Sequence, residues 1–198
     1  MADQRHLDSS PIVRRLWLSD RQAVLDYFCR LDADTRANRF MGQVSEAGLR
    51  AYADQAMSAR GVMFGAFLDG TLRGLGELRP AGPGPSNYFV GPEAEAAFAV
   101  ERPFRRMGLG AALFARITQA ARNRGVCDLH VRCFARNGPM IRLATRQGAT
   151  LSRDGLDADG SLHLNRATPL SLWYESIAEA FDFTLSVSAK TLDRKDAA

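Results

Sequence analysis

A short basic loop with two glycines is the stretch of this chain whose residue types could do chemistry. It runs from Arg105 to Gly110 with the sequence RRMGLG, after an apolar segment and before a helical pattern. Two glycines two residues apart let the backbone turn tightly, with no Cβ to obstruct a ligand. We expect the next helix to start at or just after Gly110, so that its unpaired N–H groups point into the loop. Those amides, the helix dipole and the arginines predict an anion site for a phosphate or pyrophosphate. The alternative is a glycine helix cap with solvated arginines.

The bulk composition is that of one globular domain. The chain has 198 residues, of which 46% are hydrophobic and 24% charged, enough for a sizeable core. No apolar run approaches the roughly 20 residues of a membrane span, and the N-terminus MADQRHLDSS lacks the apolar core of a secretory signal. We therefore expect a cytoplasmic protein with no membrane partner.

Cysteine and histidine usage argues against disulfides and metal. The three cysteines, Cys29, Cys127 and Cys133, are odd in number and lack CxxC spacing, which predicts buried free thiols in a reducing compartment. The three histidines are scattered and form no cluster with metal-ligand spacing. We predict no metal site.

The positive charge is almost entirely arginine. The net charge is +4, and the only lysines are Lys190 and Lys195. Basic residues cluster at Arg102, Arg105 and Arg106, in and beside the glycine loop. Because no long basic run is interleaved with aromatic residues, the sequence does not favour a nucleic-acid-binding protein.

Hydrophobic periodicity and turn residues predict the elements that position this loop. In the first half we expect a strand at 12–18, a helix at 20–31, a turn or short helix at 32–39, a helix from Ser45, a hairpin of strands 62–68 and 71–79 around Asp69-Gly70, a Pro/Gly loop at 80–87 and a strand at 94–100. In the second half we expect a helix at 111–124 ended by Gly125, a strand at 128–135, a helix at 140–147, short strands at 149–152 and 161–165 around the turn-rich GLDADG, and a helix starting at Thr168-Pro169.

The C-terminal segment is predicted to lie outside the main domain. Apolar residues alternate from Phe181 to Val187, which suggests a strand or extended tail after the last helix. We divide the chain into a flexible leader (1–11), a main domain (12–168), a C-terminal helix or extension (169–188) and a mobile tail (189–198).

The element order and the loop together resemble the GNAT superfamily of acetyl-CoA-dependent N-acetyltransferases. The strand EAAFAV (95–100) leads into RRMGLG, which fits the family's Gln/Arg-x-x-Gly-x-Gly/Ala signature. A second strand and an Asn-initiated helix follow at the family's usual distance. The resemblance covers about residues 12–168 and is similar to the branch that includes bacterial protein-lysine acetyltransferases. It implies an α/β (α+β) fold: a mixed, mostly antiparallel sheet of six to seven strands flanked by about four helices, plus a C-terminal helical extension.

The resemblance also implies how acetyl-CoA is held. In the family, loop amides bind the CoA pyrophosphate, the strand before the loop pairs with the pantetheine arm, and an asparagine holds that arm from the other side. Carried over to this sequence, the loop residues are Arg105, Arg106, Met107, Gly108, Leu109, Gly110 and Ala111, the strand residues are Phe98, Ala99 and Val100, and the asparagine is Asn137.

Acetyl transfer to an amine needs a proton acceptor, because a lysine-like amine has a pKa of about 10.4 in water. Glu95 is the first candidate, since it matches the glutamate that this branch often uses as a base. The alternative is a strand-edge carboxylate paired with a nearby arginine. Strand parity puts Glu95 on one face with Ala97, Ala99 and Glu101. Glu77 is the second candidate, whereas we expect Glu93 and Glu101 to be solvent-facing charges.

The sequence departs from the family pattern at the general acid. Many members place a tyrosine seven residues after the asparagine, and here that residue is Ala144. Either the thiolate leaves with help from water or backbone dipoles, or another residue serves as the acid. Cys133 and Tyr88 are the candidates, each also readable as a packed side chain or a loop aromatic. For the oxyanion, the simplest donor is a strand amide near Val100.

Two functions remain open at this point. The first is an N-acetyltransferase that moves an acetyl group from acetyl-CoA to a primary amine, either a protein lysine or a small molecule, and the second is a non-catalytic acyl-CoA-binding regulatory module.

The C-terminal aromatics either form a homodimer face or cover the sheet; they are Trp173, Tyr174, Phe181 and Phe183.

Overall fold

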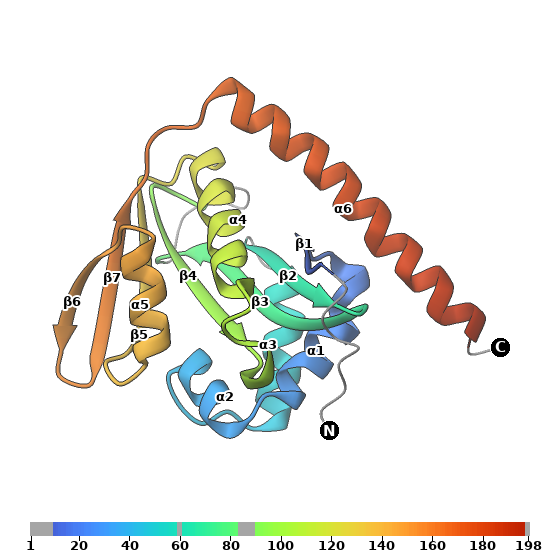
Figure 1. Cartoon of the computed structure of the whole chain (residues 1–198), viewed down its shortest axis with the longest axis horizontal. Helices are drawn as coiled ribbons and strands as arrows, with labels where there is room; N and C mark the ends of the chain where they lie inside the picture. The colour runs from blue at the N-terminus through green and yellow to red at the C-terminus, as the bar shows by residue number, and fades with distance from the viewer. Residues whose placement is uncertain (1–9, 59–60, 83–89, 197–198) are drawn as a thin grey trace.

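One seven-stranded sheet, in the order β1-β2-β3-β4-β5-β7-β6, runs through the molecule (Figure 1). The computed structural model describes residues 10–58, 61–82 and 90–196, with side chains described except at 57–58 and 187–196. Every neighbouring pair of strands is antiparallel except β4 and β5, which run parallel. The predicted mixed, mostly antiparallel sheet is confirmed. The strands are β1 (Ile12–Arg15), β2 (Val62–Leu68), β3 (Thr71–Pro80), β4 (Glu93–Val100), β5 (Asp128–Phe134), β6 (Thr150–Asp154) and β7 (Asp157–His163).

Helices cover both faces of the sheet and bury an apolar core on each. On one face α4 packs against β2, β3 and β4 and buries Phe114 and Ile117. On the other face α1 and α3 pack over the sheet and bury Phe28 and Leu49. The helices are α1 (Arg21–Arg30), α2 (Ala33–Phe40), α3 (Glu46–Ser58), α4 (Leu109–Asn123), α5 (Gly138–Arg146) and α6 (Pro169–Asp196).

The predicted hairpin is confirmed as β2 and β3. Asp69 and Gly70 connect these strands with φ angles of 50° and 71°. Two successive residues with positive φ fit a tight hairpin turn whose twist matches that of the strands, and Asp-Gly is a favoured pair there. The following strand β4 pairs with β3 in one uninterrupted register, from Gly74 opposite Val100 to Pro80 opposite Ala94.

The parallel pair of β4 and β5 separates almost as soon as it forms. Only residues 93–95 of β4 are paired with residues 128–130 of β5. Beyond Glu95 the two strands diverge, and in Figure 1 helix α5 lies beside β5 on the far side of this gap from α4. The second half of β4 therefore has a partner on its β3 side but none on its β5 side within the described residues.

Three expectations about local structure are corrected. The stretch GLDADG is mostly strand, because β7 begins at Asp157 and only Gly155 and Leu156 separate it from β6. Glu101 is buried rather than solvent-facing, since Arg30 and Arg73 both donate to its carboxylate. The thiols are free, but only that of Cys133 is buried; those of Cys29 and Cys127 are exposed.

The C-terminal expectation of a strand or extended tail from Phe181 is wrong. Helix α6 continues from Pro169 to Asp196 and includes most of the residues assigned to a tail. The alternation of apolar residues was misleading. A strand would place Phe181, Phe183 and Leu185 on one buried side, whereas in the helix all three are exposed. The leader at 1–9 and most of the Pro/Gly loop lie outside the described residues.

A buried carboxylate ties α6 to the start of the fold. Asp20 accepts hydrogen bonds from both terminal nitrogens of Arg14, at 2.9 and 2.6 Å, and from the Trp17 amide at 2.9 Å. Ser186 of α6 donates to the same carboxylate at 3.0 Å. Burial alone would raise the pKa of Asp20, but these hydrogen bonds and the Arg14 charge outweigh it, so the pKa lies below its ordinary value of 3.8.

Replacing Asp20 with asparagine tests this anchor. Asp20→Asn leaves the buried Arg14 without a counter-charge, so we expect the free energy of unfolding at pH 7 to fall by about 3 kcal/mol. Because the folded-state pKa is below the unfolded value of 3.8, the contribution of the carboxylate is present above that pH and is lost as the pH falls through the folded pKa. Urea unfolding measured from pH 7 to pH 3 should show the variant and the parent converging at the acid end.

The exposed pair of Glu46 and Arg50 on α3 supplies the control. Glu46→Gln is expected to change stability little at any pH, because exposed helix pairs contribute little. A loss in Asp20→Asn that stays constant down to pH 3 would contradict the role assigned to the charge.

Candidate active site

The glycine loop connects β4 to α4, and two of its residues adopt the left-handed backbone conformation. Gly108 has φ 83° and acts as the N-cap of α4, and Arg106 has φ 65°. Helix α4 starts at Leu109, slightly earlier than predicted. The amide of Ala112 donates to the Gly108 carbonyl at 3.0 Å. The amides before it in the first turn have no acceptor in the helix, and they are available to an anion.

The second glycine of the motif allows a close approach between two helices. A Cβ on Gly110 would lie 3.3 Å from Cδ2 of Leu143 on α5. The glycine thus lets α5 come close to the first turn of α4.

Arg105 is a structural part of the loop. Its Nε donates to the Val100 carbonyl at 3.1 Å, and a terminal nitrogen donates to Oγ1 of Thr35 at 2.5 Å. Thr35 also donates from its amide and hydroxyl to Asp32, the N-cap of α2. Burial alone would raise the pKa of Asp32, but the Thr35 hydrogen bonds and the nearby arginine charges lower it overall. Arg105 therefore links the end of β4 to the start of α2.

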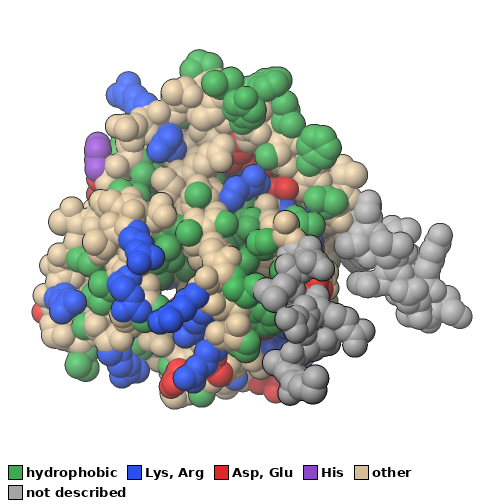
Figure 2. Space-filling model, in the orientation of Figure 1, with side chains coloured by type: hydrophobic (Ala, Val, Ile, Leu, Met, Phe, Trp, Pro, Cys, Tyr) green, Lys and Arg blue, Asp and Glu red, His purple; other side chains and the backbone are tan. Residues whose placement is uncertain are grey.

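The loop opens onto a cavity of about 620 Å³ lined by α2, the end of β4, the glycine loop and α5. Its charged lining residues are all arginines: Arg105, Arg106, Arg142 and Arg146. No acidic residue is found in the lining contributed by residues 10–58, 61–82 and 90–196. Figure 2 shows basic side chains gathered around a hollow on this face of the molecule. The cavity is therefore suited to a ligand that carries several negative charges.

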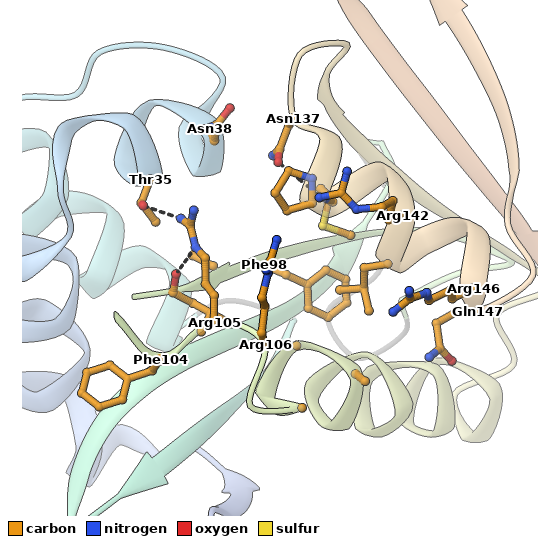
Figure 3. Close-up of a pocket in the computed structure, with 18 residues that line it drawn as sticks. Thr35, Asn38, Phe98, Phe104, Arg105, Arg106, Asn137, Arg142, Arg146 and Gln147 are labelled. Atoms are coloured by element: carbon orange, nitrogen blue, oxygen red, sulfur yellow. Dashed lines mark hydrogen bonds between the residues drawn. The ribbon is translucent and has the colours of Figure 1, made fainter. Parts of the chain in front are cut away.

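Arg106 differs from Arg105 in having no structural partner in the described residues. Its side chain is exposed and extends into the cavity (Figure 3). The guanidinium is thus free to pair with a ligand.

The floor of the cavity is the open half of β4. Phe98, Ala99 and Val100 all line it, and the Phe98 ring stacks on Phe114 with centroids 5.0 Å apart. The amide of Glu101 donates to the Arg73 carbonyl, and Ala81 donates to Glu93 across the same strand pair. Since hydrogen-bonding direction alternates along an antiparallel strand, the backbone groups of odd-numbered β4 residues face β3. Those of Phe98 and Val100 then face the cavity.

Asn137 lies opposite this floor, at the start of α5. Its Oδ1 accepts a hydrogen bond from the Met140 amide at 3.3 Å and so caps the helix. Its side-chain nitrogen has no partner in the described part of the chain, and the side chain points toward the cavity (Figure 3). The asparagine singled out from the sequence therefore does lie at the site.

Neither candidate base lines the cavity. Glu95, Ala97 and Ala99 share one face of β4, because their partners on β3 are Arg79, Glu77 and Leu75 in regular register. That face is the one covered by α1 and α3, since Leu75 and Ala99 belong to its core. The predicted strand parity is confirmed, and Glu95 and Glu77 lie on the face opposite α4.

The two carboxylates differ in their surroundings. Glu95 is half-buried and accepts from Arg79 at 3.0 Å, so the arginine pair foreseen as the alternative is present. Glu77 is buried and is held by Arg39 and by the Tyr52 hydroxyl. Burial raises the pKa of Tyr52 to about 12, while the adjacent Arg39 charge acts in the opposite direction. The Glu77 carboxylate is thus engaged inside the fold.

Among the described residues that line the cavity, none has a side chain suited to a general acid. Ala144, at the expected tyrosine position, is buried in α5. Cys133 is buried in β5 and does not line the cavity, and burial beside Asp159 raises the pKa of its thiol. Tyr88 lies outside the described residues.

A family model decides which family this architecture belongs to. The model of the acetyltransferase (GNAT) family matches residues 26–149, more than half of the chain. The chain belongs to the acetyltransferase (GNAT) family. The reaction of this family is acetylation that depends on acetyl-CoA. No curated protein matches the chain in a sequence search.

Solved GNAT structures share the fold at low sequence identity. The GNAT domain of S. lividans PAT superposes with a TM-score of 0.68 at 19% identity, covering 80% of this chain and 93% of that one. The putative acetyltransferase yncA of Salmonella typhimurium, solved with its cofactor acetyl-CoA, gives 0.62 at 16% identity, with 81% and 97% covered. The ribosomal-protein-alanine N-acetyltransferase of Brucella melitensis gives 0.61 at 19%, with 77% and 99% covered.

Nine lining residues of this GNAT domain escaped the sequence analysis, and four of them are polar residues on two helices. Thr35 and Asn38 come from α2, and Arg142 and Arg146 come from α5. The two arginines are four residues apart in a helix that starts at Asn137, which places them on one face. The sequence shows this spacing, but it does not show which face of α5 lines the cavity, because that depends on how α5 packs in the fold.

The described residues of this GNAT acetyltransferase contain neither a candidate membrane-spanning helix nor a candidate metal site. None of its described helices is both long and apolar enough to span a membrane. No group of three or more histidine, cysteine or acidic residues within the same residues could hold a metal ion.

The contrast between the two loop arginines yields a stability prediction. Arg105→Ala removes hydrogen bonds to Val100 and Thr35, so we expect the free energy of unfolding to fall by about 1–2 kcal/mol. Arg106→Ala removes no bond within the fold and should change it by less than about 0.5 kcal/mol. Urea unfolding of both variants measures the difference, and equal losses would show that Arg106 has a structural partner after all.

Proposed function

We propose that the chain is an N-acetyltransferase that moves an acetyl group from acetyl-CoA to a primary amine, either a protein lysine or a small molecule. The observation that carries the proposal is the all-arginine cavity beside the open edge of β4. A cationic site next to unpaired strand backbone suits a ligand that has phosphates at one end and a long amide-containing arm.

The phosphates of CoA would lie at the glycine loop. The first-turn amides of α4 would donate to the pyrophosphate from Leu109, Gly110 and Ala111, with Met107 and Gly108 completing the turn. Arg106 supplies an unpaired positive charge, while Arg105 holds the loop. Arg142 and Arg146 face the same cavity from α5 and add charge on its other side.

The pantetheine arm would pair with β4 like an added strand. Phe98 would make the strand contacts with its amide and carbonyl, since both face the cavity. Val100 would contribute its amide, because Arg105 already donates to its carbonyl. The backbone of Ala99 faces β3 instead, so its part is limited to lining the floor. The free side-chain nitrogen of Asn137 would donate to the arm from the other wall.

Acetyl-CoA supplies the acetyl group as a thioester, and the protein must supply a proton acceptor for the amine. Glu95 is the better candidate because its carboxylate is half-buried with one arginine partner, and proton transfer through water is open to it. Glu77 is the weaker one, since Arg39 and Tyr52 already occupy its carboxylate. The Val100 amide, directed toward the cavity, would stabilise negative charge developing on the thioester oxygen.

The missing general acid keeps a non-catalytic acyl-CoA-binding module as the alternative. Ala144 replaces the usual tyrosine, and the lining residues include no other acid. In the proposed enzyme the thiolate leaves with help from water and from the positive field of the cavity. A panel of amines and lysine peptides separates the two functions, because CoA release above the uncatalysed rate with even one acceptor excludes a pure binding module.

The phosphate site is tested by charge reversal. Arg106→Glu places a carboxylate in the cavity, and we expect the acetyl-CoA Kd, measured by calorimetry, to rise at least about tenfold. Gly108→Glu should do the same by obstructing the loop. The matched control is Arg153→Glu, which makes the same charge change on the exposed strand β6 away from the cavity. Unchanged affinity in both loop variants, or an equal loss in the control, would remove the proposed site.

The base is tested by a pair of variants at one ion pair. Glu95→Gln should lower kcat by about 10²–10⁴-fold with little effect on acetyl-CoA affinity, as expected for loss of a general base. Arg79→Met breaks the same ion pair but keeps the carboxylate, so it should retain kcat within about tenfold. Equal losses in the two variants across the pH range would assign Glu95 a structural role, and the same measurement on Glu77→Gln would then decide for or against the second candidate.

A further inference from the structure

Helix α6 binds the domain through its polar side. Arg124 donates to Glu175 at 2.5 Å and to Glu179 at 3.1 Å. Asp182 accepts from the Arg116 side chain at 2.6 Å and from the Arg15 amide at 2.8 Å. The helix lies along the β1 side of the sheet (Figure 1).

The opposite side of α6 is apolar and faces outward. Six large apolar residues recur at helical spacing along it, and each is between 38% and 67% exposed. Such spacing places them on one stripe of the helix surface. A surface helix in a monomer shows the reverse orientation, with the apolar stripe toward the core. We call these residues the α6 stripe: Leu170, Trp173, Tyr174, Ile177, Phe181 and Leu185.

The stripe carries no charge. From Pro169 to Ser186 the only charged residues are Glu175, Glu179 and Asp182, and all three are bound to the domain. An interfacial helix that binds anionic lipid needs lysine or arginine beside its apolar face. This stretch of α6 has neither, so its composition favours a protein surface over a membrane.

The size of the stripe matches half of a stable interface. Its exposed fractions correspond to apolar surface on the order of 700 Å². The largest apolar patch on an ordinary monomer is about 300–600 Å², and a standard interface buries about 800 Å² on each partner. Trp173 and Tyr174 are of the types that contribute most at interface centres.

We propose that the α6 stripe binds the α6 stripe of a second copy of this chain, forming a symmetric dimer. An uncharged apolar stripe is complementary to itself, which is the requirement of a two-fold interface, and its helical spacing lets the side chains of two such helices interdigitate. The acidic anchors explain why the stripe faces outward, since they hold the other side of the helix against the domain. No α6 residue whose side chain is described (169–186) lines the arginine cavity, so the proposed contact leaves both cavities uncovered by this part of the helix.

One substitution in the stripe and one beside it test the proposal. In analytical ultracentrifugation, the full chain at about 50 µM should sediment at twice its monomer mass. This concentration is above the dissociation constants of about micromolar or lower that standard-size interfaces give. Trp173→Glu puts a charge in the stripe and should weaken self-association at least about tenfold. The matched control is Ser176→Glu, which adds the same charge at an exposed position of α6 outside the stripe and should leave the dimer intact.

Circular dichroism and acetyl-CoA titration establish that both variants are folded with an open cavity. A monomeric parent chain at this concentration overturns the proposal, as does a dimer that Trp173→Glu leaves unaltered. Sedimentation of a monomeric parent with vesicles of neutral or anionic phospholipid, lost in Trp173→Glu, would assign the stripe to a membrane and equally overturn it.

Discussion

The early separation of β4 from β5 is the constraint on which the site depends. Three residue pairs join these strands, after which the backbone groups of Phe98 and the amide of Val100 are left facing a cavity, while Arg105 donates to the Val100 carbonyl. Unpaired backbone donors and acceptors need a partner, and burying them without one is costly. The fold resolves this by keeping the gap open to solvent and ligand. Part of the sheet edge in this GNAT domain thus remains unpaired beside the cavity.

Two local features border that gap. Arg105 joins the end of β4 to α2 through Thr35, and the missing side chain of Gly110 leaves room for Leu143 of α5 beside the first turn of α4. Arg105 makes these hydrogen bonds within the fold. The neighbouring Arg106 has no partner in the described residues, so its charge is available to a ligand. Preorganisation of this kind lowers the cost of ordering the site on binding.

Local sequence signals predicted the elements well, and failed where tertiary contacts decide. The Asp69-Gly70 hairpin and the strand–loop–helix around Gly108 follow from turn chemistry and periodicity. The outward face of α6 was not predictable in this way, because its alternating aromatics mimic a strand and only its ion pairs to the domain fix its orientation. The position of Arg142 at the cavity was not predictable from the sequence either, because it depends on how α5 packs across the gap.

We propose that CoA completes the sheet at the open edge of β4. Amide hydrogen exchange along residues 97–100, followed by NMR with and without saturating acetyl-CoA, tests this proposal directly. We expect new protection at the Phe98 and Val100 amides, with little change at Ala97 and Ala99, whose amides already face β3. Exchange at Phe98 and Val100 that is unaltered by bound acetyl-CoA would contradict it.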